Sequence, residues 1–315
     1  MDLATQPTQV IRIRPAREIT SELLIKWISS LDTPSNSFRT RKTYFGAIKQ
    51  LLQYFSLTGI KSPEKEDLLA WKESLKASGL SPGTINLYIT AARLFFQFLE
   101  NAGIYENIAS GIKGLTLSKF HKKGALKETE AGEVIEAATN ARDKAILSLM
   151  FSSGLRCIEI ARADIDDFFT SRGRPFLYIL RKGRTEKEPV PLEPETYKAL
   201  LAYLSGKEKN TGALFTGASR NHSRGSRLST RSISGIVKAA MIKAGYNSPQ
   251  LTAHSTRHSA ATIALDNGAS IEQVSQLLGH SNINTTMIYI HQKAILDNPC
   301  PTIIGEAIAK ARGDK

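Results

Sequence analysis

The chain has 315 residues, of which 41% are apolar, and a formal net charge of +13 at pH 7. This length favours two domains over one, and the apolar fraction is sufficient for packed cores. No apolar run approaches the roughly 18 residues of a membrane span, and two cysteines, Cys157 and Cys300, support neither a disulfide framework nor a metal cluster.

The basic excess is spread through both halves of the chain. It favours a polyanionic partner such as nucleic acid, because each neutralised phosphate releases condensed counterion. Solvated basic faces are the alternative. Residues 1–18 lack the apolar core of an export signal and are predicted to be a flexible basic arm, with a disordered terminus of no function as the other interpretation.

Residues 19–103 are predicted to form a helical domain. Apolar residues recur at helical spacing in four segments, and Ser81-Pro82 has the pattern of a helix cap followed by a first-turn proline. The four predicted helices cover residues 19–31, residues 37–57, a segment from Ser62-Pro63 to Gly79, and a segment from Ser81-Pro82 to Gly103.

Two groups of basic residues in this half are candidates for contact with a DNA backbone. A solvated helix face explains the basic residues of the second helix equally well. Residues 104–124 show no sustained period and are predicted to be a linker, whose basic end supplies the second group. The candidates are Arg39, Arg41, Lys42 and Lys49 on the second helix, and Lys122 and Lys123 in the linker.

The second half, residues 125–297, is predicted to be mostly helical with one β-hairpin, followed by a tail helix within residues 298–315. The whole chain is therefore expected to be mainly α with a small β-sheet (α+β). The predicted elements are helices at 129–140, 142–153, 231–244, 259–267 and 270–278, and strands at 176–181 and 188–192.

Cutting a phosphodiester without a metal requires cations on the non-bridging oxygens, a nucleophile in line and a proton donor for the leaving oxygen. Arginine suits the first task because its planar fork binds two phosphate oxygens and stays charged at physiological pH. Arg156, in Ser-Gly-Leu-Arg-Cys-Ile-Glu, and Arg257, in His-Ser-Thr-Arg-His, are the candidates. For Arg156 the alternative is a structural ion pair with Glu159, one helical turn away.

Tyr289 is the candidate nucleophile, and its phenol needs neighbouring cations or a base because the ordinary pKa is about 10. A core aromatic is the alternative, but His254, Arg257 and His280 precede it closely in the sequence. Lys182 stands in the Lys-Gly turn of the predicted hairpin, where a mobile lysine can give a proton to a leaving oxygen. Turn chemistry alone is the alternative for this lysine.

Together these motifs resemble those of the tyrosine recombinases of the phage-integrase and Xer superfamily. The resemblance implies a SAM-like core-binding domain at 19–103 and a catalytic domain at 125–297 that close around duplex DNA. It extends from about Ile19 to His291 and is strongest in Ser153 to Glu159, in His254 to His258, and in Leu277 to His280 with Tyr289 downstream.

The resemblance also implies a mechanism. Arg156 and Arg257 would hold the scissile phosphate, and Tyr289 would attack it to give a 3′-phosphotyrosyl link and a free 5′-hydroxyl. Because this link conserves the energy of the bond, a 5′-hydroxyl from a partner duplex would reseal it through a Holliday junction. Neither a cofactor nor a metal is expected.

The remaining site residues take their roles from the same resemblance. Lys182 would be the general acid toward the 5′-oxygen, although Lys187 can also be aligned with this position. His254 would assist proton transfer at the tyrosine, and His280 would bond the phosphate. Arg184 is a further candidate for phosphate contact.

The expected function is therefore site-specific recombination, for integration or excision of a mobile element or for dimer resolution. The alternatives are a type IB topoisomerase-like DNA-relaxing enzyme and a non-catalytic DNA-binding protein. The expected partners are double-stranded DNA at specific core sites and a homotetramer on paired sites, with accessory proteins left open and no membrane. The tail helix would dock on a neighbouring protomer, or alternatively on its own domain. A cytoplasmic location is expected, on the nucleoid when the protein binds DNA.

Overall fold

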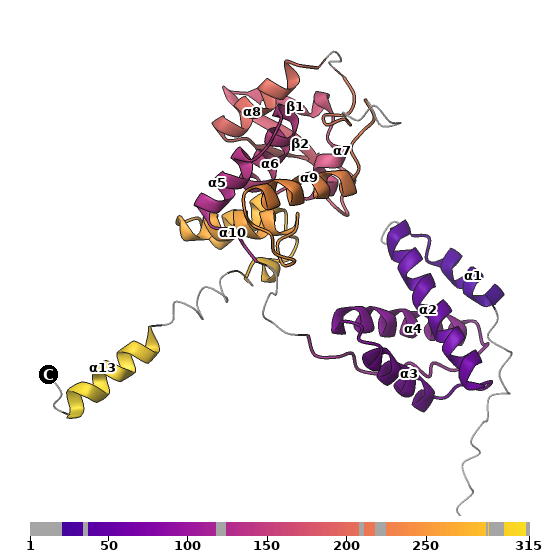
Figure 1. The fold of residues 1–315 in the computed structure, drawn as a ribbon. Helices are drawn as coiled ribbons and strands as arrows, with labels where there is room; N and C mark the ends of the chain where they lie inside the picture. Colours follow the sequence, from indigo (N-terminus) through magenta and orange to yellow (C-terminus); the bar gives the residue numbers. More distant parts are fainter. Residues whose placement is uncertain are drawn as a thin grey trace, which may run out of the picture. The chain divides into compact units, whose positions relative to one another are not determined.

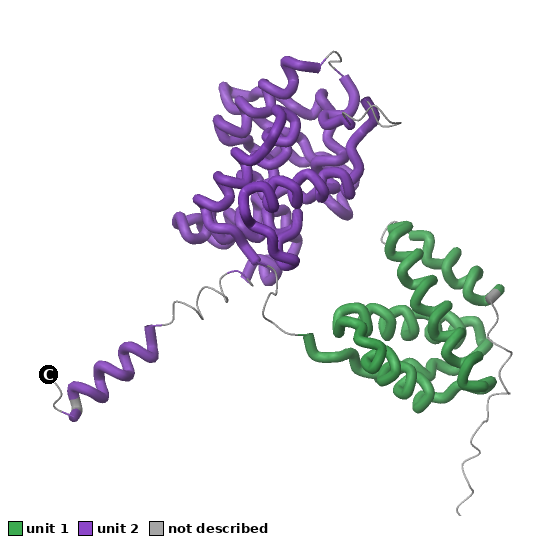
Figure 2. The backbone as a smooth tube through the Cα atoms, in the orientation of Figure 1, with its two compact units in different colours: residues 1–119 green, residues 120–315 purple. Residues whose placement is uncertain are grey.

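The computed structural model describes residues 21–33, 37–117, 124–207, 211–217, 225–287, 289 and 299–312. The chain divides into two compact units, unit 1 with residues 1–119 and unit 2 with residues 120–315 (Figure 2). Most of the described structure is helical, and a sheet of three short strands lies in unit 2 (Figure 1). The prediction of a mainly α protein with a small sheet is confirmed.

The described part of unit 1 contains the four helices that the sequence predicts. Ser37 and Ser81 begin the second and fourth helices, because each hydroxyl accepts the backbone N–H three residues later, at 3.2 Å. The third helix does not begin at Ser62-Pro63. It begins at Lys65, where the Asp67 carboxylate accepts the Glu64 N–H at 2.8 Å. The helices are α1 (Ser21–Ser30), α2 (Phe38–Thr58), α3 (Lys65–Ala77) and α4 (Pro82–Asn101).

The segment after α4 belongs to the core of unit 1. Ile108 and Ile112 are buried among the apolar side chains of the four helices. The Asn86 side chain of α4 donates to the carbonyl of Leu115 at 2.8 Å. Residues 104–117, which we expected to be part of a linker, therefore pack on unit 1. Their apolar residues follow no helical or strand period, so the sequence pattern does not reveal their burial.

Unit 2 is built around one helix whose middle is buried on all sides. Residues 145–151 of this helix, α6, are all buried, and α6 packs against α5, α8, α9 and α10. The described helices of unit 2 are α5 (Glu128–Glu136), α6 (Ala141–Ser152), α7 (Cys157–Arg162), α8 (Pro194–Leu204), α9 (Thr230–Lys243), α10 (Ser255–Asp266), α11 (Ile271–Leu278) and α13 (Cys300–Arg312).

The sheet is antiparallel in the order β1-β2-β3, with β1 at Phe168–Ser171, β2 at Arg174–Leu180 and β3 at Lys187–Pro191. The predicted hairpin of β2 and β3 is present. Strand β1 was not predicted, because four residues without alternation give too short a pattern. It is joined to β2 by Arg172 and Gly173, which both have positive φ, 50° and 75°.

Helix α10 begins at Ser255, four residues before the predicted start at Ser259. The Ser255 hydroxyl accepts the N–H of Thr252 at 3.0 Å at this helix start. Residues 255–261 are all buried although most are polar. Because apolar periodicity is the signal for a buried helix, a buried segment of polar residues is not recognised as a helix from the sequence. The His-Ser-Thr-Arg-His motif therefore lies at the start of a helix and not in a loop.

Helix α13 lies within the predicted range of the tail helix, residues 298–315, and carries the exposed apolar side chains Ile303, Ile304 and Ile308. Among the helices in the described ranges, none is long and apolar enough to cross a membrane.

Candidate active site

Arg257 is the most deeply buried cation of the site. It lies in the first turn of α10 and is only 1% exposed. Its Nη1 donates to the carbonyl of Gly154 at 2.8 Å, and its Nη2 donates to the carbonyl of Leu278. Burial, and next the charge of Arg156, lower the pKa of Arg257 to about 10, so the guanidinium stays charged at neutral pH. Arg257 thereby joins the α6–α7 turn to the end of α11.

Arg156 precedes α7 and is held by a buried carboxylate. Its guanidinium donates to Glu159 at 2.7 Å and its backbone N–H to the second oxygen at 2.9 Å. The Glu159 side chain is fully buried, whereas 26% of the Arg156 side chain is exposed. The ion pair is therefore present, but Arg156 also lowers the pKa of both Arg257 and His280, which places it beside them. The pair orients this arginine within the site.

His280 follows Gly279, which ends α11 with a left-handed φ of 60°. Its Nδ1 lies 2.8 Å from the hydroxyl of Thr286. Burial, followed by the charges of Arg257 and Arg156, lowers the pKa of His280 to about 4. The imidazole is therefore neutral at physiological pH, and it can make hydrogen bonds without adding a further positive charge.

Tyr289 is 9% exposed and packs against Leu278, Val274 and Ala261. Burial raises the pKa of its phenol, while the charges of Arg257 and Arg156 lower it in part. Its ring also meets the ring of His258 edge to face, at 5.2 Å between centroids. The apolar packing of Tyr289 is that of a core aromatic residue. The nearby charges of Arg257 and Arg156 are what set it apart from an ordinary core tyrosine.

The other two candidate catalytic residues lie at the margin of this group. His254 is exposed at the start of α10, its ring is 4.9 Å from that of His258, and its charge contributes to the low pKa of His280. Lys182 is exposed in the β2–β3 turn. The competing residue, Lys187, bonds to Asp167 at 2.6 Å, and this bond raises the pKa of the lysine. Lys187 is thus occupied by a carboxylate, which favours Lys182 for proton transfer.

The candidate DNA contacts in unit 1 differ in their surroundings. Arg39, Lys42 and Lys49 are exposed on α2. Arg41 is half-buried and pairs with Asp32 at 3.0 Å, so it also ties α2 to the end of α1. The three exposed residues are thus better placed for a partner than Arg41.

Of the remaining candidates, Arg184 is exposed in the β2–β3 turn, with its Nε 3.8 Å from Glu188. Lys122 and Lys123 lie outside the described residues.

Two residues near the site were not assigned a role from the sequence. His258 lies between His254 and Tyr289, and the motif alone does not show which imidazole meets the phenol. Arg181 is buried and is one of the charges that lower the pKa of Arg257 and His280. The alternation along β2 was a usable signal for Arg181, because every second residue before it, Ile179 and Leu177, points inward.

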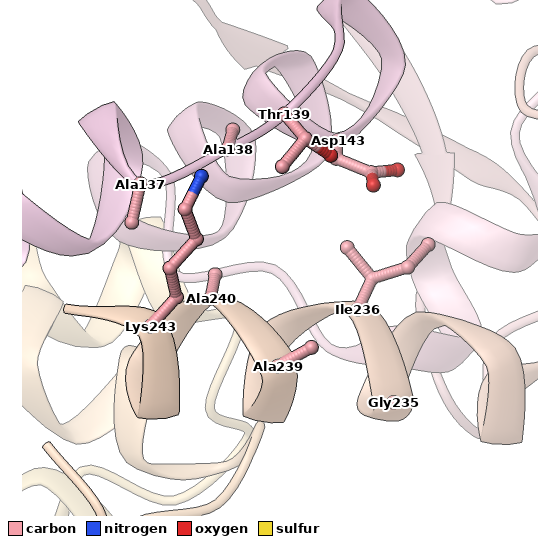
Figure 3. A pocket seen from close by; sticks show the side chains of 9 residues that line it. All are labelled: Ala137, Ala138, Thr139, Asp143, Gly235, Ile236, Ala239, Ala240 and Lys243. Carbon is pink, nitrogen blue, oxygen red and sulfur yellow. The ribbon is translucent and has the colours of Figure 1, made fainter. Parts of the chain in front are cut away.

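A cavity of about 320 Å³ lies elsewhere in unit 2, between the α5–α6 turn and α9 (Figure 3). Its wall is mostly apolar, with Asp143 and Lys243 among the lining residues, and it shares no residue with the group around Arg257. We therefore do not assign the candidate chemistry to it. Within the described ranges, no cluster of three or more histidine, cysteine or acidic side chains could hold a metal ion.

Two family models match the chain. Residues 125–294 match the model of the phage integrase family, and residues 11–103 match that of the phage integrase N-terminal SAM-like domain. The chain is 32% identical to tyrosine recombinase XerA of Pyrococcus horikoshii, over 86% of this chain and 89% of that protein. It is 31% identical to tyrosine recombinase XerD of Oceanobacillus iheyensis, over 72% and 77%.

Solved structures with a similar fold are more distant in sequence. XerH site-specific recombinase bound to a palindromic difH substrate has a TM-score of 0.69 and 20% identity, with 91% of this chain and 93% of that chain covered. A lambda integrase tetramer bound to a Holliday junction has a TM-score of 0.69 and 15% identity, with 87% and 77% covered.

Proposed function

The chain belongs to the phage integrase family and is a tyrosine recombinase, an enzyme that cleaves and rejoins DNA at specific sites, and we propose that Tyr289 carries out the cleavage. The observation that carries this proposal is the burial of Arg257 within electrostatic reach of both Arg156 and Tyr289. Two guanidinium groups beside one phenol provide the cations and the nucleophile that the reaction requires.

In the proposed cleavage, Arg156 and Arg257 bind the non-bridging oxygens of the scissile phosphate. The phenolic oxygen of Tyr289 bonds to phosphorus while the bond from phosphorus to the 5′-oxygen breaks, which leaves a 3′-phosphotyrosyl link. The phenolic proton passes to His258, whose ring contacts that of Tyr289, and His258 gives up a proton to His254, whose ring contacts its other side. The two arginines stabilise the negative charge that develops in the transition state, and this lowers the free energy needed to remove the phenolic proton.

The leaving oxygen needs a proton of its own, which Lys182 supplies from the β2–β3 turn. We assign His280 the neutral tautomer in which Nδ1 accepts from the Thr286 hydroxyl, because its Nε2–H is then available to donate to the phosphate. In the second step a 5′-hydroxyl of the partner strand attacks the phosphotyrosyl link and releases Tyr289. The number of phosphodiester bonds is conserved, so the exchange requires neither ATP nor a cofactor, and it proceeds through a Holliday junction.

We further propose that unit 1 is the core-binding domain, that unit 2 is the catalytic domain, and that both bind the same duplex. The exposed Arg39, Lys42 and Lys49 of α2 support this role for unit 1, since lysine and arginine contacts to phosphate position a protein on DNA. Lys122, Lys123 and Arg184 extend the proposed contacts, and residues 1–18 act as a basic arm.

The tail helix α13 is proposed to dock on a neighbouring protomer and so to build a tetramer on paired sites. Ile303, Ile304 and Ile308 are between 49% and 58% exposed, which is unfavourable for a helix without a partner. Replacing Ile304 with aspartate is expected to weaken synapsis of two sites while cleavage of a single half-site duplex continues. If synapsis remains at the level of the unchanged protein, docking in trans is wrong.

The nucleophile is tested with a nicked suicide duplex, from which the 5′ fragment diffuses away after cleavage. Tyr289→Phe is expected to bind this duplex and to form no covalent complex. Tyr178→Phe is the matched control, because this exposed tyrosine of β2 lies outside the site and is expected to leave the covalent yield unchanged. A covalent complex with Tyr289→Phe would assign the nucleophile to another residue.

Two further measurements define the biological role. A supercoiled plasmid carrying two sites yields recombinant circles if the enzyme exchanges strands, and only relaxed plasmid if it acts as a topoisomerase. Mapping the covalent cleavage positions on chromosomal and element DNA distinguishes integration or excision of a mobile element from resolution of replicon dimers.

A further inference from the structure

Arg181 lies at the point where β2 enters the turn that carries Lys182. Only 5% of this arginine is exposed, although the next residue, Lys182, is exposed. Burying a guanidinium costs solvation free energy, so its position requires specific bonds in return.

The bonds of Arg181 connect two elements that are about 100 residues apart in the sequence. Its Nη2 donates to the carbonyl of Leu277 at 2.9 Å, in the last turn of α11. Its Nε donates to the carboxylate of Glu188, on the opposite strand of the hairpin, at 3.3 Å. One side chain therefore links both strands at the base of the hairpin to the end of α11.

Gly279 provides the space for this connection. A Cβ atom at position 279 would lie 2.4 Å from both Cδ and Nε of Arg181, so the arginine passes directly over the backbone of this glycine. The next residue is His280. The hairpin that carries Lys182 and the loop that carries His280 thus meet at the Arg181 side chain.

The position of this side chain also brings a third guanidinium close to the site. Arg181 is among the charges that lower the pKa of Arg257 and of His280, after the larger effect of burial. Its Nη1 is buried and has no hydrogen-bond partner among the described residues. The bonds to Leu277 and Glu188 therefore offset only part of the cost of burying this guanidinium.

We infer that Arg181 is a positioning residue, which fixes the base of the hairpin on α11 so that Lys182 reaches the leaving 5′-oxygen while His280 holds the phosphate. This inference rests on the roles proposed above for Lys182 and His280. It predicts that loss of Arg181 impairs protonation of the leaving group and not the attack by Tyr289.

The test compares two suicide duplexes, one with the natural 5′-bridging oxygen and one with sulfur in its place. A thiolate leaves without being protonated, so the sulfur substrate bypasses a defect in the general acid. Arg181→Met retains a straight side chain over Gly279 and removes the guanidinium. Arg174→Met is the matched control, since Arg174 is exposed at the other end of the same strand. Lys182→Ala provides the reference for loss of the acid itself.

On the natural substrate, Arg181→Met is expected to cleave about 10- to 100-fold more slowly than the unchanged protein. On the sulfur substrate it is expected to return to within a few-fold of the unchanged protein, as Lys182→Ala does, and Arg174→Met is unaffected on both. An equal defect of Arg181→Met on both substrates overturns the inference, because it indicates direct contact with the phosphate. Failure of the sulfur substrate to rescue Lys182→Ala instead refutes the role proposed for Lys182.

Amide hydrogen exchange measures the positioning independently of the chemistry. In the full-length Arg181→Met protein, faster exchange is expected at the N–H groups of Gly279 and His280, which bond to carbonyls of α11 at 3.0 Å, and in the β2–β3 turn. Exchange in α6 is expected to stay as in the unchanged protein, which shows that unit 2 is folded. Unchanged exchange at α11 and in the turn overturns the inference.

Discussion

The buried carboxylate of Glu159 offers the clearest quantitative test of how the site is held together. Glu159 is fully buried and accepts two hydrogen bonds from Arg156, at 2.7 and 2.9 Å. Hydrogen bonds to charged groups contribute about 1.5–3 kcal/mol each, against about 0.5–1.5 kcal/mol for neutral ones. Glu159→Gln keeps the volume and removes the charge, so it is expected to lower the free energy of unfolding of unit 2 by about 2 kcal/mol. Glu159→Ala removes both bonds and is expected to cost about 3–5 kcal/mol.

The assay must separate the two units, because a chain of two units need not unfold in one step. Both tryptophans of the protein, Trp27 and Trp71, are buried in unit 1, so tryptophan fluorescence during urea unfolding reports on that unit alone. Amide hydrogen exchange of α6 and α10 reports on unit 2. The fluorescence transition is expected to be unchanged in both variants, while the exchange free energies of unit 2 fall.

The test compares the losses of unfolding free energy in the two Glu159 variants. A loss below about 0.5 kcal/mol in Glu159→Gln, which is the range of ordinary surface substitutions, would falsify the view that this buried charge stabilises the site. Equal losses in the glutamine and alanine variants would also contradict it, because the charge and the hydrogen bonds are expected to contribute separately.

Three further outcomes are expected. Arg257→Lys removes the forked donor that reaches Gly154 and Leu278. It is expected to slow cleavage at least about 100-fold, while DNA affinity in a gel-shift assay stays nearly unchanged. A variant that loses only affinity for DNA would argue against a role of Arg257 in the transition state. The pKa of His280 is about 4 in the folded protein and 6.5 ordinarily, so below pH 6.5 the unfolded chain binds a proton that the native state does not. Stability should therefore decrease as the pH falls from 6.5 toward 4, and a His280→Gln variant that shows the same decrease would exclude His280 as its source. Gly154→Ala would place Cβ 2.5 Å from Leu278, whereas the Cβ of Gly183→Ala, also at positive φ, meets nothing within 4 Å. Gly154→Ala should therefore lower the thermal midpoint clearly more than Gly183→Ala. Equal decreases would show that backbone strain alone, and not the contact with Leu278, is the cause.

Much of the fold could be predicted from the sequence where local signals are strong. The serines before α2 and α4 marked helix starts that the structure confirms, and α11 begins one residue after the predicted start at residue 270, where Ser270 and Gln273 form a capping pair. Such signals succeed because a cap is satisfied by atoms within three or four residues. Strand β1 was missed, and the start of α10 was placed too late, because their stability depends on packing against distant segments.

The candidate site, too, could be predicted from the sequence only in part. The residue types and motifs of Arg156, Arg257, His280 and Tyr289 were sufficient to indicate the chemistry of a tyrosine recombinase. The sequence could not show that Arg156 stays in the site while it pairs with Glu159. Nor could it show that Lys187 pairs with Asp167. Both conclusions depend on which side chains share a buried volume.

The sequence by itself therefore determined the kind of reaction, since the functional groups that can cleave a phosphodiester are a property of residue types and their motifs. Only the tertiary structure decided the protonation state of His280 and the burial of Arg257 and Arg181. The reason is physical: a pKa and a hydrogen bond depend on solvent exclusion and on charges a few ångströms away. In this protein those charges come from α7, α10 and the end of β2, which are distant in the sequence and meet only when unit 2 folds.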